Sequence, residues 1–217
     1  MFTLLMHIVR DNKLFFILFG LWVLVGFILA VSIPADDIFF FINQHHNDFL
    51  DKLMTVFSGF GRGDTIPIVL LSLLLLPAFR HRLYILTSLL FGLFIPVSIY
   101  FLKKVYGCPR PLVEYGAQKV HTVPWLDNLF NNSFPSGHTI GAFGFFLILS
   151  IWLPKTQKAW SVLFIILALA CAYSRPYLGQ HFFKDIYAGS IVGVGMVLTL
   201  YLILHFIFGP EKQDPVN

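Results

Sequence analysis

The chain alternates between long apolar runs and short polar connections, and this spacing predicts membrane-spanning helices. A helix needs about 20 mainly apolar residues to cross about 30 Å of hydrocarbon. The second, fourth and fifth runs are shorter than this, so we expect their ends to extend into the flanking polar residues. The pattern predicts an all-α bundle of transmembrane helices in a single domain over residues 1–217, with six spans at Leu14–Ile33, Thr65–Phe79, Leu83–Leu102, Thr139–Leu153, Ala159–Tyr173 and Ile186–Phe208.

A different pattern fills residues 36–64, between the first two runs. Apolar residues recur there at roughly helical spacing with polar residues between them, at Ile38, Phe41, Ile42, Phe49, Leu53, Phe57 and Phe60. An amphipathic helix of this kind can lie in the membrane interface, and a helix packed on a bundle shows the same spacing. Both interpretations stay open. The adjacent His45 and His46 are expected to be a hydrated interfacial pair in preference to a metal site.

Composition supports the membrane interpretation, since 57% of the residues are hydrophobic and 12% are charged. A soluble domain usually has about 45–50% apolar and about 25% charged residues. The polar residues are therefore too few to cover a water-soluble globule. The net charge of +4 does not indicate nucleic acid, because the basic residues flank the apolar runs, where they match membrane topology and anionic lipid.

Basic residues also predict the orientation of the chain. The connections expected inside the cell are short and rich in Lys and Arg, whereas those expected outside are more than twice as long in total. The higher density of Lys and Arg in the inside connections favours cytoplasmic N- and C-termini. The first run, with Arg10 and Lys13 before it and Ala30-Val31-Ser32 near its end, resembles a signal peptide. Its apolar length exceeds the usual 7–15 residues or so of such a segment, which favours a retained anchor.

The residues best suited to chemistry gather at three junctions that this topology puts on one membrane face. The third run ends at Lys103, the fourth begins at His138 and the sixth begins after Asp185. Arg110 and Arg175 lie near the same junctions, with no matching number of acids. Cations that repel one another at a partly desolvated site are usually functional. A phosphate group would relieve the repulsion, because guanidinium binds it bidentately and lysine adds a point charge.

Helix geometry strengthens this interpretation. Ser136 and Gly137 lie where a helix begins, and the unpaired N–H groups of such an end bind anions. His181 and Asp185 are four residues apart, so they share one face if the last helix begins near Gln180. Asp185 would then orient the imidazole for nucleophilic attack. His138, from another helix, is free to act as general acid.

Each of these residues taken alone has a more ordinary explanation. A single interfacial histidine or arginine is usually structural, and Pro-Ser-Gly is commonly a turn. A metal site of His138, His181 and Asp185 would be opposed by the three nearby cations, so we expect neither a metal nor a cofactor. Cys108 and Cys171 lack the spacing of a redox motif or a zinc finger, and a disulfide between them stays open.

Three motifs together resemble the signature of the type-2 phosphatidic acid phosphatase superfamily. The motifs are Lys-x6-Arg-Pro, Pro-Ser-Gly-His and Ser-Arg-x5-His-x3-Asp. They are filled here by Lys103…Arg110-Pro111, by Pro135-Ser136-Gly137-His138 and by Ser174-Arg175…His181…Asp185. The resemblance covers residues 103–185, and the six-span layout extends it over most of the chain.

The resemblance implies a metal-independent lipid phosphatase. His181 would attack phosphorus to form a phosphohistidine, Asp185 would orient it and His138 would protonate the leaving group before water hydrolyses the intermediate. The phosphoryl oxygens would be held by Lys103, Arg110, Ser136, Gly137 and Arg175. Family members of this size are typically enzymes of the bacterial inner membrane with a periplasmic site.

The substrate and the acceptor stay open at this level. Candidate substrates are undecaprenyl pyrophosphate, lipid A phosphate, phosphatidylglycerophosphate and phosphatidic acid, and Leu112–Asn132 is a candidate headgroup lid. A phosphotransferase that passes the phosphoryl group to a second lipid is the nearest alternative. A non-catalytic lipid-binding or transport protein is disfavoured, since binding alone has no need of a nucleophile.

Overall fold

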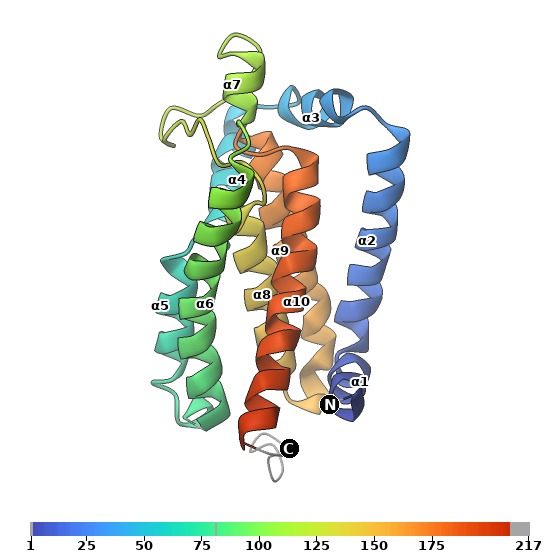
Figure 1. Cartoon of the computed structure of the whole chain (residues 1–217), viewed down its shortest axis with the longest axis vertical. Coiled ribbons are helices and arrows are strands. Elements are labelled where there is room, and N and C mark those ends of the chain that lie inside the picture. The colour runs from blue at the N-terminus through green and yellow to red at the C-terminus, as the bar shows by residue number, and fades with distance from the viewer. Residues whose placement is uncertain (1, 81, 209–217) are drawn as a thin grey trace.

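The computed structural model describes residues 2–80 and 82–208, and every regular element in them is helical. Long helices stand side by side, and α1 and the end of α10 lie at the same, lower end of the bundle (Figure 1). The elements in chain order are α1 (Phe2–Asp11), α2 (Lys13–Ser32), α3 (Ala35–Asn43), α4 (Asp48–Gly59), α5 (Thr65–Leu73), η1 (Pro77–Phe79), α6 (Arg82–Tyr106), α7 (Pro111–Tyr115), α8 (Gly137–Trp152), η2 (Lys155–Trp160), α9 (Ser161–Tyr177) and α10 (Phe183–Phe208).

Four segments of the described chain are long and apolar enough to cross a membrane: Lys13–Ser32, Arg82–Tyr115, Lys155–Tyr177 and Phe183–Phe208. They correspond to the first, third, fifth and sixth predicted runs, and the first of them ends one residue earlier than predicted, at Ser32. The fourth run forms α8, an apolar helix of 16 residues. By length and composition, the described chain therefore has four candidate spans, and the second and fourth predicted runs form shorter helices.

The second predicted run does not form one helix. α5 ends at Leu73, and the next residues turn through short-range hydrogen bonds until Pro77 begins η1. Leu76 is extended, as expected for a residue before proline, because the proline ring disfavours the helical conformation there. The helix that begins at Thr65 is therefore shorter than the predicted run from Thr65 to Phe79.

The amphipathic segment between the first two runs divides into two helices with different positions. α3 crosses the upper end of the bundle, whereas α4 runs along its side and is followed below by α5 (Figure 1). α4 buries Asp51, Met54 and Ser58. The first half thus has the position of an interfacial helix, and the second half is the packed helix of the alternative interpretation.

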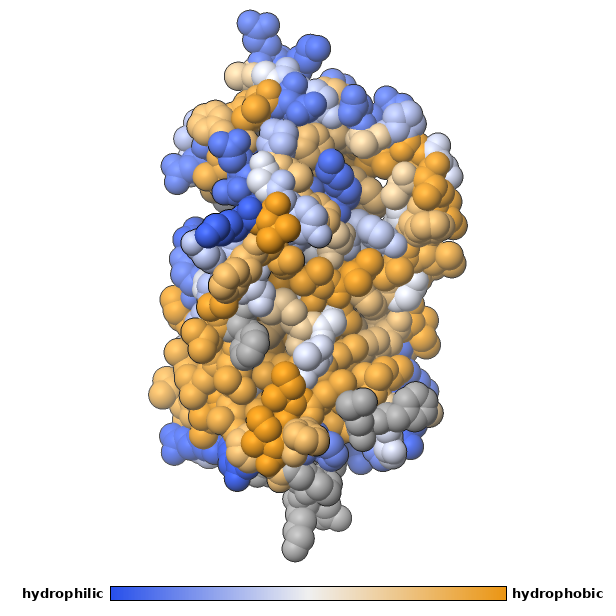
Figure 2. All heavy atoms as spheres, viewed as in Figure 1, coloured by the Kyte–Doolittle hydropathy of each residue, from blue (hydrophilic) through white to orange (hydrophobic). Residues whose placement is uncertain are grey.

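The core is built around α8, which packs against both α9 and α10. Its residues from Thr139 to Ile148 are all buried, which explains why this helix is apolar on every side. Small residues allow the close packing: a Cβ atom added at Gly193 of α10 would overlap the carbonyl oxygen of Ile140. In the space-filling view, an apolar belt lies between polar upper and lower ends (Figure 2), as expected for a membrane protein.

We predict that Gly193→Ala destabilises the bundle, since the added methyl group must push α10 away from α8. Overpacking of this kind costs about 1–3 kcal/mol, and it should lower the midpoint of thermal unfolding in detergent. Gly195→Ala on the same helix is the matched control, because nothing lies within 4 Å of its Cβ position. Equal unfolding midpoints for the two variants would contradict the packing described for α8 and α10.

Candidate active site

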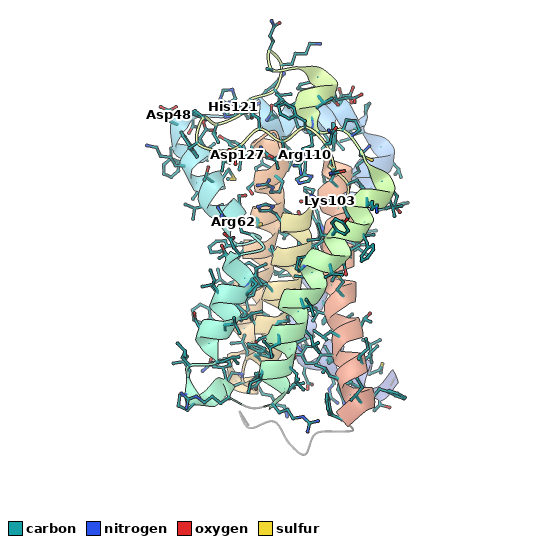
Figure 3. The ribbon with its side chains drawn as sticks, turned by 60° about the vertical axis from the view of Figure 1, so that its left-hand side comes forward. Asp48, Arg62, Lys103, Arg110, His121 and Asp127 are labelled. Carbon is teal, nitrogen blue, oxygen red and sulfur yellow. The ribbon has the colours of Figure 1, made fainter. Side chains whose placement is uncertain are left out.

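The candidate site lies at the upper end of the bundle, where α6 and α9 end and α8 and α10 begin (Figure 1). Lys103 lies near the upper end of α6, with Arg110 above it in the connection that follows (Figure 3). The charge of Lys103 interacts with those of Arg110, Arg175 and Asp185. The three predicted junctions therefore meet in space.

A tight linker between α9 and α10 brings His181 into the site. α9 stops because Leu178, Gly179 and Gln180 turn their N–H groups back onto the last carbonyls of the helix. Gly179 has a φ of +70°, and a side chain there would also meet the backbone of His121. His181 follows directly and is 1% exposed.

His181 is not on the last helix, which begins at Phe183 and not near Gln180 as supposed. It nevertheless meets Asp185, with 3.4 Å between Nδ1 and Asp185 Oδ2. The same oxygen accepts a 2.9 Å hydrogen bond from the backbone N–H of Phe182, an arrangement in which a carboxylate caps the start of its own helix. The capping bond fixes the carboxylate that faces the imidazole.

Ser133 is a member of the site that the sequence reasoning missed. Its hydroxyl donates a 2.5 Å hydrogen bond to Asp185 Oδ2, and its Oγ lies 3.4 Å from His181 Nδ1. The side chain is fully buried. The only signal available was its place two residues before Pro135 in the second motif. Ser133 therefore joins His181 and Asp185 in one buried polar group.

Arg110 is 3% exposed and is held mainly by backbone oxygens. Its Nε donates to the carbonyl oxygen of Asn131 at 2.9 Å, and its Nη1 donates to that of Gln180 at 2.8 Å. Nη1 also lies 3.3 Å from Nε2 of His181. The guanidinium thus fastens the long connection before α8 to the His181 linker, and it contacts Nε2, the imidazole nitrogen that does not face Asp185.

Arg175, near the end of α9, is 4% exposed and has an unsatisfied donor. Its Nη1 donates to the hydroxyl of Ser58 on α4, while its Nε has no partner within the described residues. A buried guanidinium N–H without a partner calls for an explanation, and an anion bound at this site would supply the missing acceptor. Ser58 carried no signal in the sequence.

The start of α8 provides the remaining predicted residues. Ser136 caps the helix, and its Oγ accepts from the hydroxyl of Thr139 at 3.0 Å. Its backbone N–H donates to the carbonyl oxygen of Asp185 at 3.1 Å, so the two helix starts are joined. Gly137 is the first residue of α8, and a Cβ there would lie 3.1 Å from Ile99.

His138 follows on α8, near His181 and close enough to Arg175, Lys103 and Arg110 for a positive charge on its ring to be repelled by theirs. Its carbonyl oxygen packs against Gly61, in the break between α4 and α5, so closely that no side chain would fit there. The structure therefore brings together every residue that the sequence nominated: His181, His138, Asp185, Lys103, Arg110, Ser136, Gly137 and Arg175.

Burial lowers the pKa of His181 well below its usual value of about 6.5. The positive charges of Arg110, Arg175 and Lys103 act in the same direction, because a second cation is unfavourable beside them. The imidazole is therefore neutral at neutral pH and retains a lone pair.

The connection expected to form a headgroup lid is fastened to α3 and α4. The side chain of Asn43 donates to the carbonyl oxygen of His121 at 3.1 Å and accepts from its N–H at 2.8 Å. His121 Nε2 lies 2.9 Å from Asp51, and Trp125 donates to Thr55. Four contacts thus tie this loop down over the site.

The structure also shows the positions of the neighbouring histidines and of the two cysteines. The ring of His46 stacks on that of His121 with 3.6 Å between centroids. Within the described residues, no group of three or more His, Cys, Asp or Glu side chains has the arrangement of a metal site. Cys108 and Cys171 are both free thiols, so no disulfide joins them.

The profile of the PAP2 superfamily matches residues 82–208, more than half of the chain, and the protein therefore belongs to this superfamily. The match confirms the resemblance drawn from the three motifs. The chain is an integral membrane lipid phosphate phosphatase, a hydrolase of the PAP2 family.

Two characterised relatives are each 27% identical to this chain. Undecaprenyl-diphosphatase BcrC of Bacillus subtilis (strain 168) matches over 151 residues, 70% of this chain and 73% of that protein. Lipid A 4′-phosphatase of Bacteroides thetaiotaomicron matches over 191 residues, 80% of this chain and 78% of that protein.

Two crystal structures share the fold. LpxE of Aquifex aeolicus superposes with a TM-score of 0.59 at 26% identity, covering 76% of this chain and 93% of that one. The transmembrane PAP2-type phosphatidylglycerolphosphate phosphatase of Bacillus subtilis gives a TM-score of 0.64 at 22% identity, covering 93% and 98%.

We predict that Ser133→Ala lowers kcat about tenfold or more while KM changes little. The substitution removes the hydroxyl that holds Asp185, and a hydrogen bond to a charged group contributes about 1.5–3 kcal/mol. Steady-state phosphate release would measure both constants. Ser72→Ala is the control, because Ser72 is exposed and bonds only to its own helix. An unchanged kcat for Ser133→Ala would show that Asp185 needs no such support.

Proposed function

We propose that the protein removes phosphate from a lipid phosphomonoester or pyrophosphate through a phosphohistidine at His181. The observation that carries this proposal is the environment of the imidazole. Its Nδ1 faces Asp185 at 3.4 Å, and its Nε2 faces Arg110 at 3.3 Å. One nitrogen is thus oriented by a carboxylate, and the other lies where cations would hold a phosphoryl group.

The first step would be attack of His181 Nε2 on phosphorus, which forms an N–P bond as the P–O bond to the lipid breaks. His138, across the site on α8, would give its proton to the departing oxygen. Asp185 would stabilise the charge that develops on the imidazole ring. In the second step, His138 would take a proton from water as the water oxygen attacks phosphorus, the N–P bond would break, and phosphate would leave with His181 neutral and His138 protonated again.

The phosphoryl oxygens would be bound by the cations and by the start of α8. Lys103, Arg110 and Arg175 would provide charge, and Arg175 has a free Nε donor for this purpose. Ser136 and Gly137 lie at a helix N-terminus, where backbone N–H groups and the helix dipole favour anions. None of these steps calls for a metal ion, and we propose that the enzyme works without one.

For the substrate, we propose a lipid whose phosphate group is terminal. By their names, the two characterised relatives act on undecaprenyl diphosphate and on the 4′-phosphate of lipid A. Phosphatidylglycerophosphate and phosphatidic acid offer the same terminal group. A phosphotransferase would share the first step and differ only in the acceptor of the second.

We further propose that the single domain crosses the membrane six times, with α5 and α8 as shortened spans. The termini would be cytoplasmic and the site periplasmic, in a bacterial inner membrane. Both described ends of the chain lie at the lower end of the bundle (Figure 1). Arg10, Lys13, Lys155 and Lys158 also lie there, and basic residues favour the cytoplasmic side.

We predict that His181→Ala abolishes phosphate release from every lipid in a panel of the four candidate substrates. The purified variant would be compared with the wild type and with His45→Ala, which changes an exposed histidine outside the site. Release that survives His181→Ala would refute the phosphohistidine. A labelled acceptor lipid in the same assay tests phosphotransfer, and strong inhibition by EDTA would refute the metal-independent mechanism.

We predict that the acid limb of kcat/KM lies below pH 6.5, since the lowered pKa of His181 keeps the imidazole neutral in mild acid. Lys103→Met removes a neighbouring positive charge, which should raise this pKa and move the limb to higher pH. Lys104→Met is the matched control, because Lys104 is exposed and does not act on His181. A limb that both variants leave unmoved would disprove the electrostatic origin of the shift.

A further inference from the structure

A second, basic pocket lies at the end of the bundle away from the candidate active site. It forms where the corner between α1 and α2 meets the connection between α8 and α9, close to the N-terminus (Figure 1). The full length of α8, 16 residues, separates this end from Ser136. The pocket has a volume of about 210 Å³, below the roughly 300–1,000 Å³ of pockets that take drug-sized molecules.

Cations dominate the lining of this pocket. Arg10, Lys13, Lys155 and Lys158 line it, against the single carboxylate of Asp11 among the described residues. Asp11 is occupied by Arg10, whose Nε lies 3.1 Å from its Oδ1. The net charge of the pocket lining is therefore positive, and it faces the surface of the molecule.

The pocket is held in shape by a buried hydrogen-bond network. Asn12, at the corner between α1 and α2, is 3% exposed. Its Oδ1 accepts from Lys158 Nζ at 3.0 Å and from the hydroxyl of Ser150 at 3.1 Å. Lys158 also donates to the carbonyl oxygens of Ser150 and Ile151, at 2.7 and 3.1 Å. These hydrogen bonds join the corner between α1 and α2 to the connection between α8 and α9, so the pocket is preformed.

Exposed apolar side chains on the elements that line the pocket indicate that its ligand is a lipid. Met6 of α1 and Trp160 of η2 are each 56% exposed, and Leu14, which lines the pocket, is 36% exposed. The pocket thus lies at the boundary between the lower polar end and the apolar belt of the molecule. A free phosphate ion would gain nothing from this apolar border, whereas the acyl chains of a phospholipid would cover it.

We propose that this pocket binds the phosphate group of an anionic phospholipid in the leaflet opposite the active site. Basic pockets between membrane helices are suited to such headgroups. Lys13 and Lys155 are exposed and would contact the phosphate directly. Lys158 would add a charge from a fixed position. The site is separate from catalysis, because phosphatidylglycerol carries a phosphodiester and no terminal phosphate.

The test is a titration of the detergent-purified protein with phosphatidylglycerol, with bound lipid resolved by native mass spectrometry. The variant is Lys13→Gln combined with Lys155→Gln, which leaves the Asn12 network intact. The control is Lys52→Gln combined with Lys119→Gln, which removes the same charge from two exposed lysines on α4 and in the loop over the active site. Phosphate release by the Lys13/Lys155 variant should stay unchanged.

The proposal predicts tighter binding of phosphatidylglycerol than of phosphatidylcholine. Since a basic residue near a lipid surface contributes about fivefold, the double variant should weaken this binding by about tenfold or more. The control should bind as the wild type does. Equal binding by all three proteins would overturn the proposal, and so would displacement of the lipid by inorganic phosphate at matched concentration.

Discussion

The upper end of the molecule depends on one electrostatic constraint: three cations must be held beside a neutral histidine. Arg110 and Arg175 are almost fully buried, and Lys103 interacts with both. Repulsion between like charges grows as water is excluded, so the cluster has to be fixed by other contacts. Backbone oxygens hold Arg110, and the hydroxyl of Ser58 holds Arg175. The loop over the site and the packing of α4 on α9 both serve to place these oxygens.

α8 connects the two ends of the molecule, and the helix dipole explains much of what lies at each. Its N-terminus has unpaired N–H groups and carries the partial positive charge that suits an anion. Its C-terminus carries the opposite partial charge, and Lys158 donates there to the carbonyl oxygens of Ser150 and Ile151. Because residues Thr139 to Ile148 of this short helix are all buried, the two ends are joined through one packed core.

The sequence predicted the features that depend on local pattern. Apolar runs located the long helices, and the three motifs located the histidines, the cations and Asp185 of the candidate site, but neither Ser133 nor Ser58. It failed where distant parts of the chain decide the structure. Ser58 and Arg175 are 117 residues apart, and no local pattern links them. Ser133 was missed because a serine before Phe-Pro resembles any loop residue until Asp185 is seen to accept its hydroxyl.

Differences in detail have equally physical causes. α5 ends at Leu73, and the extended residue Leu76 and Pro77 separate it from η1, so the second predicted run does not form one helix. The turn at Gly179 keeps His181 off α10, so its contact with Asp185 is made from a linker and not along one helix face. The expected contact between His181 and Asp185 is present, but the two residues do not share a helix face. A separation of four residues also lets a side chain just before a helix meet one in its first turn.

The choice of partners for the buried cations has a consequence for turnover. Within the described residues, the groups that hydrogen-bond to Arg110 and Arg175 are carbonyls, an amide, an imidazole and a hydroxyl, all of them neutral. Neutral acceptors fix a guanidinium in place without cancelling its charge, whereas a carboxylate would do both. The one buried acid nearby, Asp185, is directed at His181, Ser133 and its own helix start. In the proposed mechanism, the cations therefore keep their charge for a phosphoryl group, and Asp185 is placed to stabilise the imidazole that would become cationic when that group is transferred.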